Sequence, residues 1–406
     1  MGKHFQSIFV LTIALLASGS ALALPFSAFD PRSFAMGGTG VAAGTSANAV
    51  FYNPALLAAA RKGEDFSLEL PIIGARVADP ENLLDAVDNF DSNTFMSDLD
   101  AALASYSPPT PSPALAAAAL KVRDALIDIS GKAVQVEGDV GFVVGIPSKK
   151  FGISVYANSW AIGGVIGDTS TDVATLNQLI ADAGAGAVPS VTTTGDLQST
   201  ISARFAIISE AGIAIARNFD GLAVGITPKY VEVKTSDYLF DASQFDSASI
   251  DLNTAETTDS DVNVDIGLAK DFHNGFKTGI VVKNAMAQEY TTSTGSKLKI
   301  EPMARLGGMY QNSWSTVALD VDLTENDPGG FDSKTQYASL GMELNLVKLV
   351  QLRVGVRHNM VDNPYGHAVD TLSAGLGFSP FGVHLDLSVA GNSDELGAAM
   401  QLGFRF

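Results

Sequence analysis

The sequence predicts an all-β transmembrane protein: an antiparallel outer-membrane β-barrel of about 14 strands with an N-terminal plug and a helical extracellular excursion. The first observation is the segment 395–406, where apolar residues alternate with small or polar ones over the length of a spanning strand, about 9–11 residues. The second is that this period-two pattern recurs along the chain. The third is that short turns and long polar loops alternate between the strands, as on the two sides of such barrels. Taken alone, 395–406 could also be an edge strand of a soluble sandwich. A sandwich, however, does not explain why short and long connections alternate along the chain.

Composition limits the classes of function. The 406 residues include 25 basic and 44 acidic side chains, a net charge of −19, which argues against a nucleic-acid partner. The absence of cysteine excludes a disulfide framework, a thiol nucleophile and a cysteine-based zinc site. Mean hydropathy is +0.20, yet no stretch after the first 23 residues reaches the ~18 consecutive apolar residues of a membrane-spanning helix. Strands are therefore expected to cross the membrane.

Residues 1–23 have the features of a secretory signal peptide. Lys3 supplies the positive charge, residues 8–17 form the apolar segment, and Ala21-Leu22-Ala23 resembles a cleavage site. An uncleaved membrane anchor is the less favoured alternative because the apolar run is short. A cleaved signal followed by barrel strands predicts the outer membrane of a Gram-negative bacterium, with outer-membrane lipid around the protein.

The segment 24–62 is expected to form an N-terminal hatch, or plug. It is rich in Gly and Ala and does not alternate. Its glycines permit tight, left-handed backbone, and its Asn-Pro-Ala run is typical of a capped helical turn with proline at the first position. A phosphate-binding loop is disfavoured because no Lys-Ser or Lys-Thr follows the glycines. The candidate gate residues are Gly37, Gly38, Gly40, Asn53, Pro54 and Ala55.

Residues 63–406 are expected to form the barrel, interrupted by an extracellular excursion at 80–132. The excursion has helical composition, is broken by the proline-rich 107–111, and offers apolar side chains as a first landing surface for a hydrophobic ligand. The candidates for this surface are Phe90, Phe95, Leu99, Leu115 and Leu120. Loops are expected at 166–195 and, with polar composition, at 288–297. Strands are expected near 66–77, 134–144, 151–155, 197–217, 222–234, 262–268, 276–285, 300–311, 314–324, 335–345, 349–359, 370–378, 383–390 and 395–406.

The polar faces of these strands are expected to line the lumen, because a Lys or Arg side chain facing lipid at the midplane would cost about 2–4 kcal/mol. Charges of both signs then lie inside, which leaves two interpretations: a hydrated, salt-bridged lumen or a charge ring that selects a substrate. His384 and Asp386 share one face, but no nucleophile motif accompanies them, so no enzymatic activity is expected. The acidic loop after Asp322 lacks EF-hand order, so neither a metal site nor a cofactor is predicted.

The N-terminal segment resembles a known family. Between Phe29 and Ala58 the chain reads FAMGGTGVA, then an Ala/Ser-rich stretch, then FYNPALLA. This is similar to the plug of the FadL-type outer-membrane transporters of long-chain fatty acids, and more closely to the FadL-like family described as conjugal transfer protein TraF. The resemblance implies a 14-strand barrel with a hatch in its lumen. It also implies a hydrophobic small-molecule ligand that enters from outside and binds an apolar pocket.

Two functions follow from the resemblance. The first is a channel or transporter for hydrophobic small molecules such as long-chain fatty acids. The alternative is a structural outer-membrane protein associated with conjugal transfer and without transport activity. A general polar porin is disfavoured because a plug blocks ion flow. The last strand also resembles the signal that the barrel-assembly machinery reads, with Phe404 and Phe406 as its residues.

Overall fold

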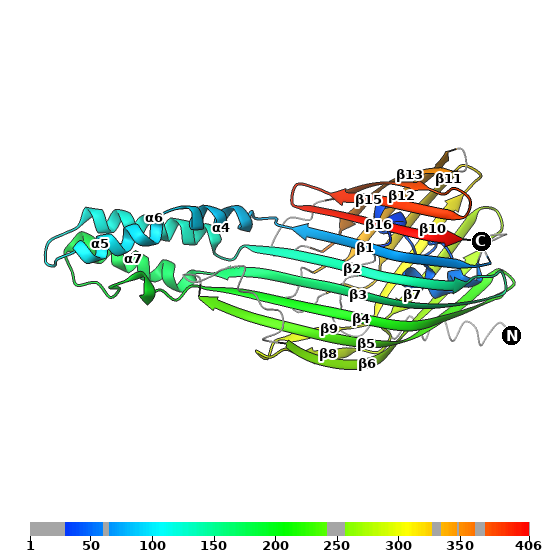
Figure 1. Ribbon diagram of the computed structural model, residues 1–406, viewed down its shortest axis with the longest axis horizontal. Coiled ribbons are helices and arrows are strands. Elements are labelled where there is room, and N and C mark those ends of the chain that lie inside the picture. The colour runs from blue at the N-terminus through cyan, green and yellow to red at the C-terminus, as the bar shows by residue number, and fades with distance from the viewer. Residues whose placement is uncertain are drawn as a thin grey trace.

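The computed structural model describes residues 29–59, 65–241, 256–326, 334–346, 349–361 and 370–405. They form a closed antiparallel barrel of 14 strands, so the predicted fold is confirmed (Figure 1). β1 pairs with β2 on one side and with β16 on the other, which closes the described ring without an unpaired edge. The barrel strands are β1 (Ser67–Ala78), β2 (Ala133–Ile146), β3 (Phe151–Asp168), β4 (Thr200–Phe219), β5 (Leu222–Asp241), β6 (Glu256–Asp271), β7 (Phe276–Lys283), β10 (Met303–Gln311), β11 (Ser315–Asp322), β12 (Tyr337–Leu346), β13 (Val350–Asn359), β14 (Thr371–Phe378), β15 (Val383–Gly391) and β16 (Glu395–Arg405).

The two ends of the barrel differ. One end, which we call the hatch end, carries the start of β1, the end of β16 and the short turns. At this end the barrel lumen contains α2 (Pro31–Ala35), α3 (Ala49–Tyr52) and η1 (Pro54–Ala58). At the head end lies a helical head, which Figure 1 shows projecting along the long axis on the side away from the C-terminal end of β16. The head consists of α4 (Leu83–Ser92), α5 (Phe95–Ser105), α6 (Pro113–Ile129), α7 (Ser170–Ala185) and η2 (Thr194–Asp196).

The barrel wall has two heights. The tall wall, defined as β3 to β6, has strands of 18, 20, 20 and 16 residues. The low wall, defined as β7 and β10 to β16, has strands of 8 to 11 residues. At about 3.3 Å per residue, the low wall matches a hydrocarbon core of ~30 Å, whereas strands of the tall wall are roughly 50–65 Å long. The tall wall therefore rises beyond the membrane toward the head end.

The side chains of β5 show where the membrane ends. Near the hatch end its outward face is apolar, and Ile226 and Tyr230 are 45% and 49% exposed. Beyond Tyr230 the polarity inverts, since Val231 and Val233 face inward and are buried while Glu232 between them faces outward. An apolar outward face suits lipid, a polar one suits water, and tyrosine favours the interface. The outer boundary of the membrane thus lies near Tyr230.

Two sequence expectations are corrected. The loop expected at 166–195 contains the end of β3 and the whole of α7. The alternation of β3 is hidden there because beyond residue 155 many residues on both of its faces are small or apolar. The polar loop expected at 288–297 contains a hairpin, β8 (Gln288–Thr291) and β9 (Lys297–Ile300), which pairs with itself and not with the barrel. The signal peptide predicted at 1–23 lies outside the described residues.

The head has an apolar core of its own. Leu99 of α5, Leu115 of α6 and Leu176 of α7 belong to one cluster and are completely buried. The Oγ of Ser112 accepts a hydrogen bond from the Leu115 amide at 3.2 Å and caps α6. No buried member of this cluster lies in a barrel strand, so the head has a core distinct from that of the barrel. At the base of the head, Leu83 and Ile129 pack with Val134 of β2. Among the described helices, none is long and apolar enough to cross a membrane.

We expect Leu99→Ala to destabilise the head and leave the barrel folded. Removing a fully buried leucine side chain costs about 2–5 kcal/mol because a cavity remains. Limited proteolysis should cut the head of this variant faster, and the heat-dependent electrophoretic shift of an intact barrel should be unchanged. Leu120→Ala, at a side chain 40% exposed on the same head, is the control and should behave as wild type. Loss of the shift in Leu99→Ala would show that head and barrel fold as one unit.

Candidate functional site in the barrel lumen

The described hatch residues, 29–59, cross the lumen at the hatch end. α2 packs against β13 to β16, and η1 packs against β3 to β6, so the hatch touches well-separated parts of the ring. The hatch side chains Tyr52, Leu56 and Leu57 form one apolar core with small residues of the wall, such as Ala214 and Ala223. The hatch therefore serves as the packed core of this half of the barrel.

A glycine belt in the wall allows this close packing. Ten glycines on ten different strands lie so close to the hatch that a Cβ atom added to any of them would contact hatch atoms. Six of the ten face each other in pairs across neighbouring strands, as Gly225 and Gly267 do. Glycine weakens a strand, and its presence here is explained by the close approach of another backbone. The glycine belt consists of Gly74, Gly152, Gly225, Gly267, Gly279, Gly307, Gly341, Gly355, Gly375 and Gly397.

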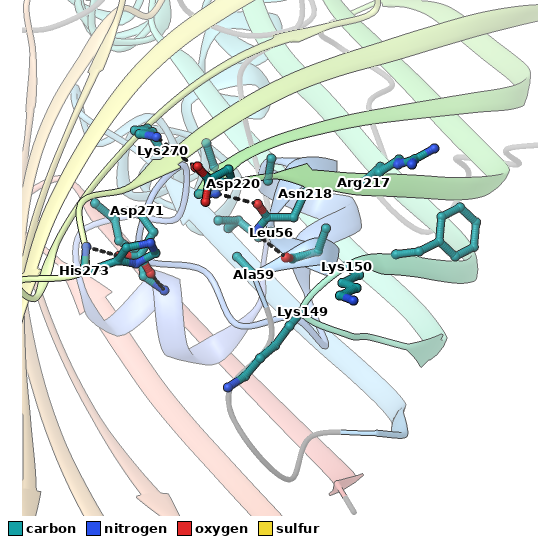
Figure 2. A pocket seen from close by; sticks show the side chains of 16 residues that line it. Leu56, Ala59, Lys149, Lys150, Arg217, Asn218, Asp220, Lys270, Asp271 and His273 are labelled. Carbon is teal, nitrogen blue, oxygen red and sulfur yellow. Dashed lines mark hydrogen bonds and ion pairs between the residues drawn. The ribbon is translucent and has the colours of Figure 1, made fainter.

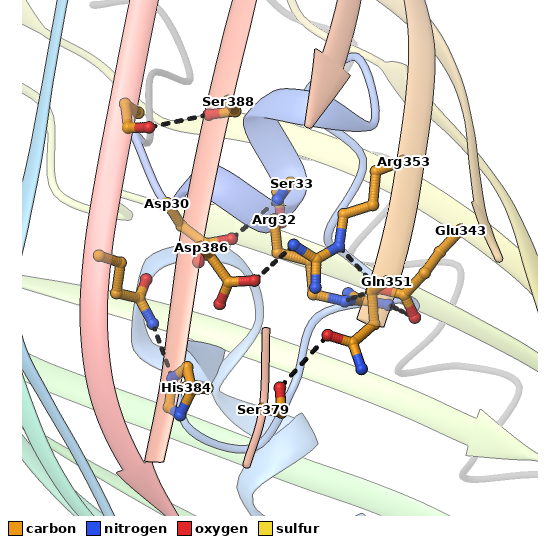
Figure 3. Close-up of polar contacts among 12 residues, drawn as sticks. Asp30, Arg32, Ser33, Glu343, Gln351, Arg353, Ser379, His384, Asp386 and Ser388 are labelled. Atoms are coloured by element: carbon orange, nitrogen blue, oxygen red, sulfur yellow. Dashed lines mark hydrogen bonds and ion pairs between the residues drawn. The ribbon is translucent and has the colours of Figure 1, made fainter. Parts of the chain in front are cut away.

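Buried ion pairs fix one side of the hatch (Figure 3). Arg32 of α2 donates to the Glu343 carboxylate of β12 at 2.8 Å, and Arg353 of β13 donates to the same carboxylate at 2.9 Å. Arg353 also donates to Asp386 of β15 at 2.5 Å. The four side chains are at most 5% exposed. Removing one partner from such a network leaves a buried unpaired charge and costs about 3–5 kcal/mol. The network therefore holds α2 in one orientation.

The glycine-rich turn of the hatch lies against the low wall. Gly37 and Gly38 have φ of +71° and +87°, a conformation that glycine adopts without steric cost. The turn directs the Gly37 amide to Ser373 Oγ at 3.0 Å and the Gly40 amide to Asp320 Oδ2 at 2.7 Å. The left-handed backbone expected from the sequence is thus present, and it serves to bring amides to acceptors on the wall.

Asn53 connects two parts of the hatch with the wall. Its Nδ2 donates to the backbone oxygens of Val41 at 2.9 Å and Leu268 at 3.0 Å, and its Oδ1 accepts from the Ala55 amide at 3.1 Å. Pro54 occupies the first position of η1, as the cap pattern predicted. All six candidate gate residues therefore lie in the hatch, at or beside its contact with the wall, and their role in gating stays a prediction.

Little space remains between the described residues of the hatch and the wall on the side of α2. A cavity of about 30 Å³ lies there, bounded by Phe34 and Tyr52 of the hatch and by Arg76 and Tyr337 of the wall. Ligand sites are typically ~300–1,000 Å³, so this space holds no organic ligand in the present conformation. Burial raises the pKa of the Tyr52 phenol well above its usual value, and the Asp30 carboxylate adds to the shift, so this side chain is neutral.

The head half of the lumen has an apolar inner surface that the sequence pattern did not reveal. Trp160, Ile208 and Val233 lie in one row across β3, β4 and β5. We call the buried inward-facing set of these strands the apolar recess; it consists of Trp160, Ile162, Ala206, Ile208, Val231 and Val233. The polarity inversion of β5 is the sequence signal that could have found it, since apolar residues point outward on one side of Tyr230 and inward on the other.

A second cavity, of about 1000 Å³, opens at the hatch end beside η1 (Figure 2). Figure 2 shows Leu56 and Ala59 between Lys149 and Lys150 on one side and Lys270 on the other. Five basic side chains and two acidic ones line the cavity, a local excess of three positive charges in a chain of net charge −19. The hatch thus lies between an apolar recess and a cationic cavity.

The predicted landing residues belong largely to the interior of the head. Leu99 and Leu115 are fully buried in its core, Phe90 and Phe95 pack against that core and are partly buried, and Leu120 is exposed. These positions explain how the head folds. A landing surface for a ligand stays a prediction.

The remaining candidate residues have separate partners. Phe404 lies in β16, opposite Leu68 of β1, and Phe406 lies outside the described residues. His384 Nε2 lies 2.6 Å from Glu69 Oε2, whereas Asp386 binds Arg353, so the two residues do not act as a pair. Within the described ranges no group of three or more His, Cys, Asp or Glu side chains is arranged to hold a metal ion.

A closed antiparallel barrel of 14 strands with a hatch packed inside defines a β-barrel of the outer-membrane type. The chain belongs to the family described as F plasmid transfer operon, TraF, protein, which matches residues 50–322. A search of curated proteins finds no match.

Two solved structures share the fold over almost the whole chain. The P. putida toluene transporter TodX is 12% identical with a TM-score of 0.50, and the match covers 94% of this chain and 99% of that chain. A deltaS2S3 mutant of TodX, described as a monoaromatic hydrocarbon channel, is 12% identical with a TM-score of 0.52, covering 93% and 98%. At this identity the two structures show the shared fold.

We expect Gly307→Val to unseat the hatch. A Cβ at Gly307 would lie 2.8 Å from Val41 Cβ and 3.1 Å from the Ala42 nitrogen, and overpacking of this kind costs about 1–3 kcal/mol. The variant should still form a heat-modifiable barrel but should conduct ions in planar bilayers, where wild type stays closed. Gly308→Val on the same strand is the matched control because a Cβ there meets nothing within 4 Å. A closed Gly307→Val barrel would mean that the hatch adapts to the added side chain.

Asn53→Ala should loosen the hatch without impairing assembly. The change removes both donated hydrogen bonds and the accepted one, and each buried group left unsatisfied costs about 1–3 kcal/mol. Brief openings in bilayer recordings and faster trypsin cleavage within the hatch are the expected results. Asn177→Ala, at an exposed position of the head, controls for the loss of an amide. Poor barrel yield from Asn53→Ala would instead assign Asn53 to assembly.

Proposed function

We propose that this protein is a gated outer-membrane channel for hydrophobic small molecules. The observation that carries the proposal is an apolar recess in the head half of a lumen whose other half is filled by a hatch. A hydrated pore gives an apolar solute no favourable contacts, whereas burial in an apolar recess releases about 25 cal/mol per Å² of its surface. An apolar recess therefore suits such solutes and not ions.

The proposed path runs from the head end to the hatch end. A solute first enters the apolar recess above the membrane boundary. Displacement of the hatch then connects the recess with the cationic cavity beside η1, which opens toward the periplasm. The fold shared with the toluene transporter TodX supports this proposal. Long-chain fatty acids are a second substrate class consistent with an apolar path.

The rival function is a structural role at the cell surface in conjugal transfer, which the family name suggests. The head favours it, because it projects from the barrel and has a core of its own. Its segments 79–132 and 168–199 carry thirteen acidic and three basic residues. Such a head suits contact with a cationic partner. Mating efficiency of a deletion strain separates the two functions.

Deletion of the protein should lower uptake of toluene and oleate severalfold, with each solute assayed separately in intact cells. Complementation with the wild-type chain should restore uptake. Gly307→Val should additionally admit small polar solutes that wild type excludes, because the hatch no longer seals the lumen. Complementation with Gly308→Val, the control, should restore uptake of toluene and oleate without admitting the polar solutes. The proposal fails if deletion leaves the uptake of both solutes unchanged, and a fall in mating efficiency alone would favour the rival.

A further inference from the structure

We propose that the apolar recess is a binding site for an uncharged aromatic molecule, and that the β8–β9 hairpin occupies this site until the ligand displaces it. The inference deepens the proposed function and rests on it for the direction of passage. Binding to the recess is a separate property that purified protein shows with or without transport.

The hairpin lies between β7 and β10 in the chain and packs against the recess. Its strands pair only with each other, so moving it breaks no hydrogen bond of the barrel ladder. Tyr290, Leu298 and Ile300 are 3%, 0% and 1% exposed and belong to the same apolar cluster as the recess. Glu289 and Lys297, on the opposite face, are exposed. The hairpin therefore presents one aromatic ring and two aliphatic side chains to the wall, as a bound ligand would.

Polar contacts at its edges hold the hairpin in place. The Asp237 carboxylate of β5 accepts from Thr292 Oγ1 at 2.5 Å and from Thr294 Oγ1. Asn263 Nδ2 of β6 donates to Gln288 Oε1 at 3.0 Å. Such bonds contribute about 0.5–1.5 kcal/mol each, because water replaces them when they break. A ligand that gains comparable apolar burial can therefore compete with the hairpin.

The charges around the recess define the class of ligand. Glu210 pairs with Val231 by register, but its carboxylate is neutralised by an ion pair with Lys229 at 2.9 Å. On the other side, Asp261 lies beside Val231 and Asp259 beside Val233 on the lumen face. A carboxylate in the recess would face these like charges at short range, whereas an uncharged molecule would not. In this structure the phenol side chain of Tyr290 packs in the recess. Its hydroxyl donates a hydrogen bond to Gln288 Oε1 at 3.1 Å. The site therefore suits a neutral aromatic molecule with one hydrogen-bond donor.

Substitutions on the two sides of this contact should have different effects on affinity. Leu298→Ala weakens only the hairpin as a competitor and should raise ligand affinity about tenfold. Val231→Ala removes recess surface from both the hairpin and the ligand, so its effect on affinity should be much smaller. Lys297→Ala removes only an exposed ion pair with Glu289 within the hairpin, which contributes little, and should leave the affinity unchanged. The heat-dependent mobility shift checks that each variant is folded. A purely structural contact would give no rise in affinity in Leu298→Ala and would overturn the competition.

Trp160 provides the readout. The chain has two tryptophans, so Trp314→Phe leaves Trp160 of the recess as the only one. Titration of this protein in detergent with 4-bromophenol, neutral at pH 7, should quench its fluorescence saturably. The matched anion 4-bromobenzoate should bind at least about tenfold more weakly because of the surrounding carboxylates. Equal or tighter binding of 4-bromobenzoate would overturn the ligand class, and the absence of saturable quenching by either molecule would overturn the site.

A reversible lock tests displacement of the hairpin directly. The chain has no cysteine, so Asp237→Cys with Thr292→Cys, at side chains that touch, introduces a single thiol pair. In the Trp314→Phe background, oxidation should abolish quenching by 4-bromophenol, and reduction should restore it. Unchanged quenching in the oxidised protein would show that the ligand reaches the recess with the hairpin in place. Saturable binding without uptake in cells would retain this site and reject the proposed transport.

Discussion

Close contact between the hatch and the barrel wall at the glycine belt is the constraint on which the rest of the structure depends. Strand interiors usually carry side chains that pack, and glycine there weakens a strand. Here hatch atoms occupy the space that side chains would fill. At Gly225, for example, the backbone of Pro54 and Ala55 takes the place of a Cβ atom. Wall and hatch are thus complementary halves of one core, and the buried Arg32–Glu343 pair fixes their relative orientation.

The two halves of the lumen have different chemistry because only one lies at membrane height. Within the membrane the outward face must be apolar, so polar residues turn inward and the hatch satisfies them, as Asp320 accepts two hatch amides. Beyond Tyr230 the outer face meets water, so the tall wall can place Val231 and Val233 inside. The apolar recess is thus a consequence of extending some strands past the lipid.

Local patterns in the sequence predicted much of the fold. Alternation placed the strands, and the run from Asn53 to Ala55 predicted a capped turn that the structure contains. The glycine belt could not be predicted, because its members are isolated in sequence and only strand register aligns them. The recess was missed because its strands alternate with the same period of two as lipid-facing strands. The only difference is that the apolar residues point into the lumen and the polar ones point outward. The β8–β9 hairpin was missed because its strands are four residues each and mostly polar.

The closure of β1 onto β16 has a consequence for assembly of the barrel. The ring encloses the hatch, and Phe34 of the hatch packs against Gly397 of β16, at the seam where the ring closes. Phe29 of the hatch likewise meets Gly74 of β1, so the hatch contacts both strands of the seam. A displaced hatch would obstruct the pairing of these two strands, so closure of the ring depends on the position of the N-terminal segment.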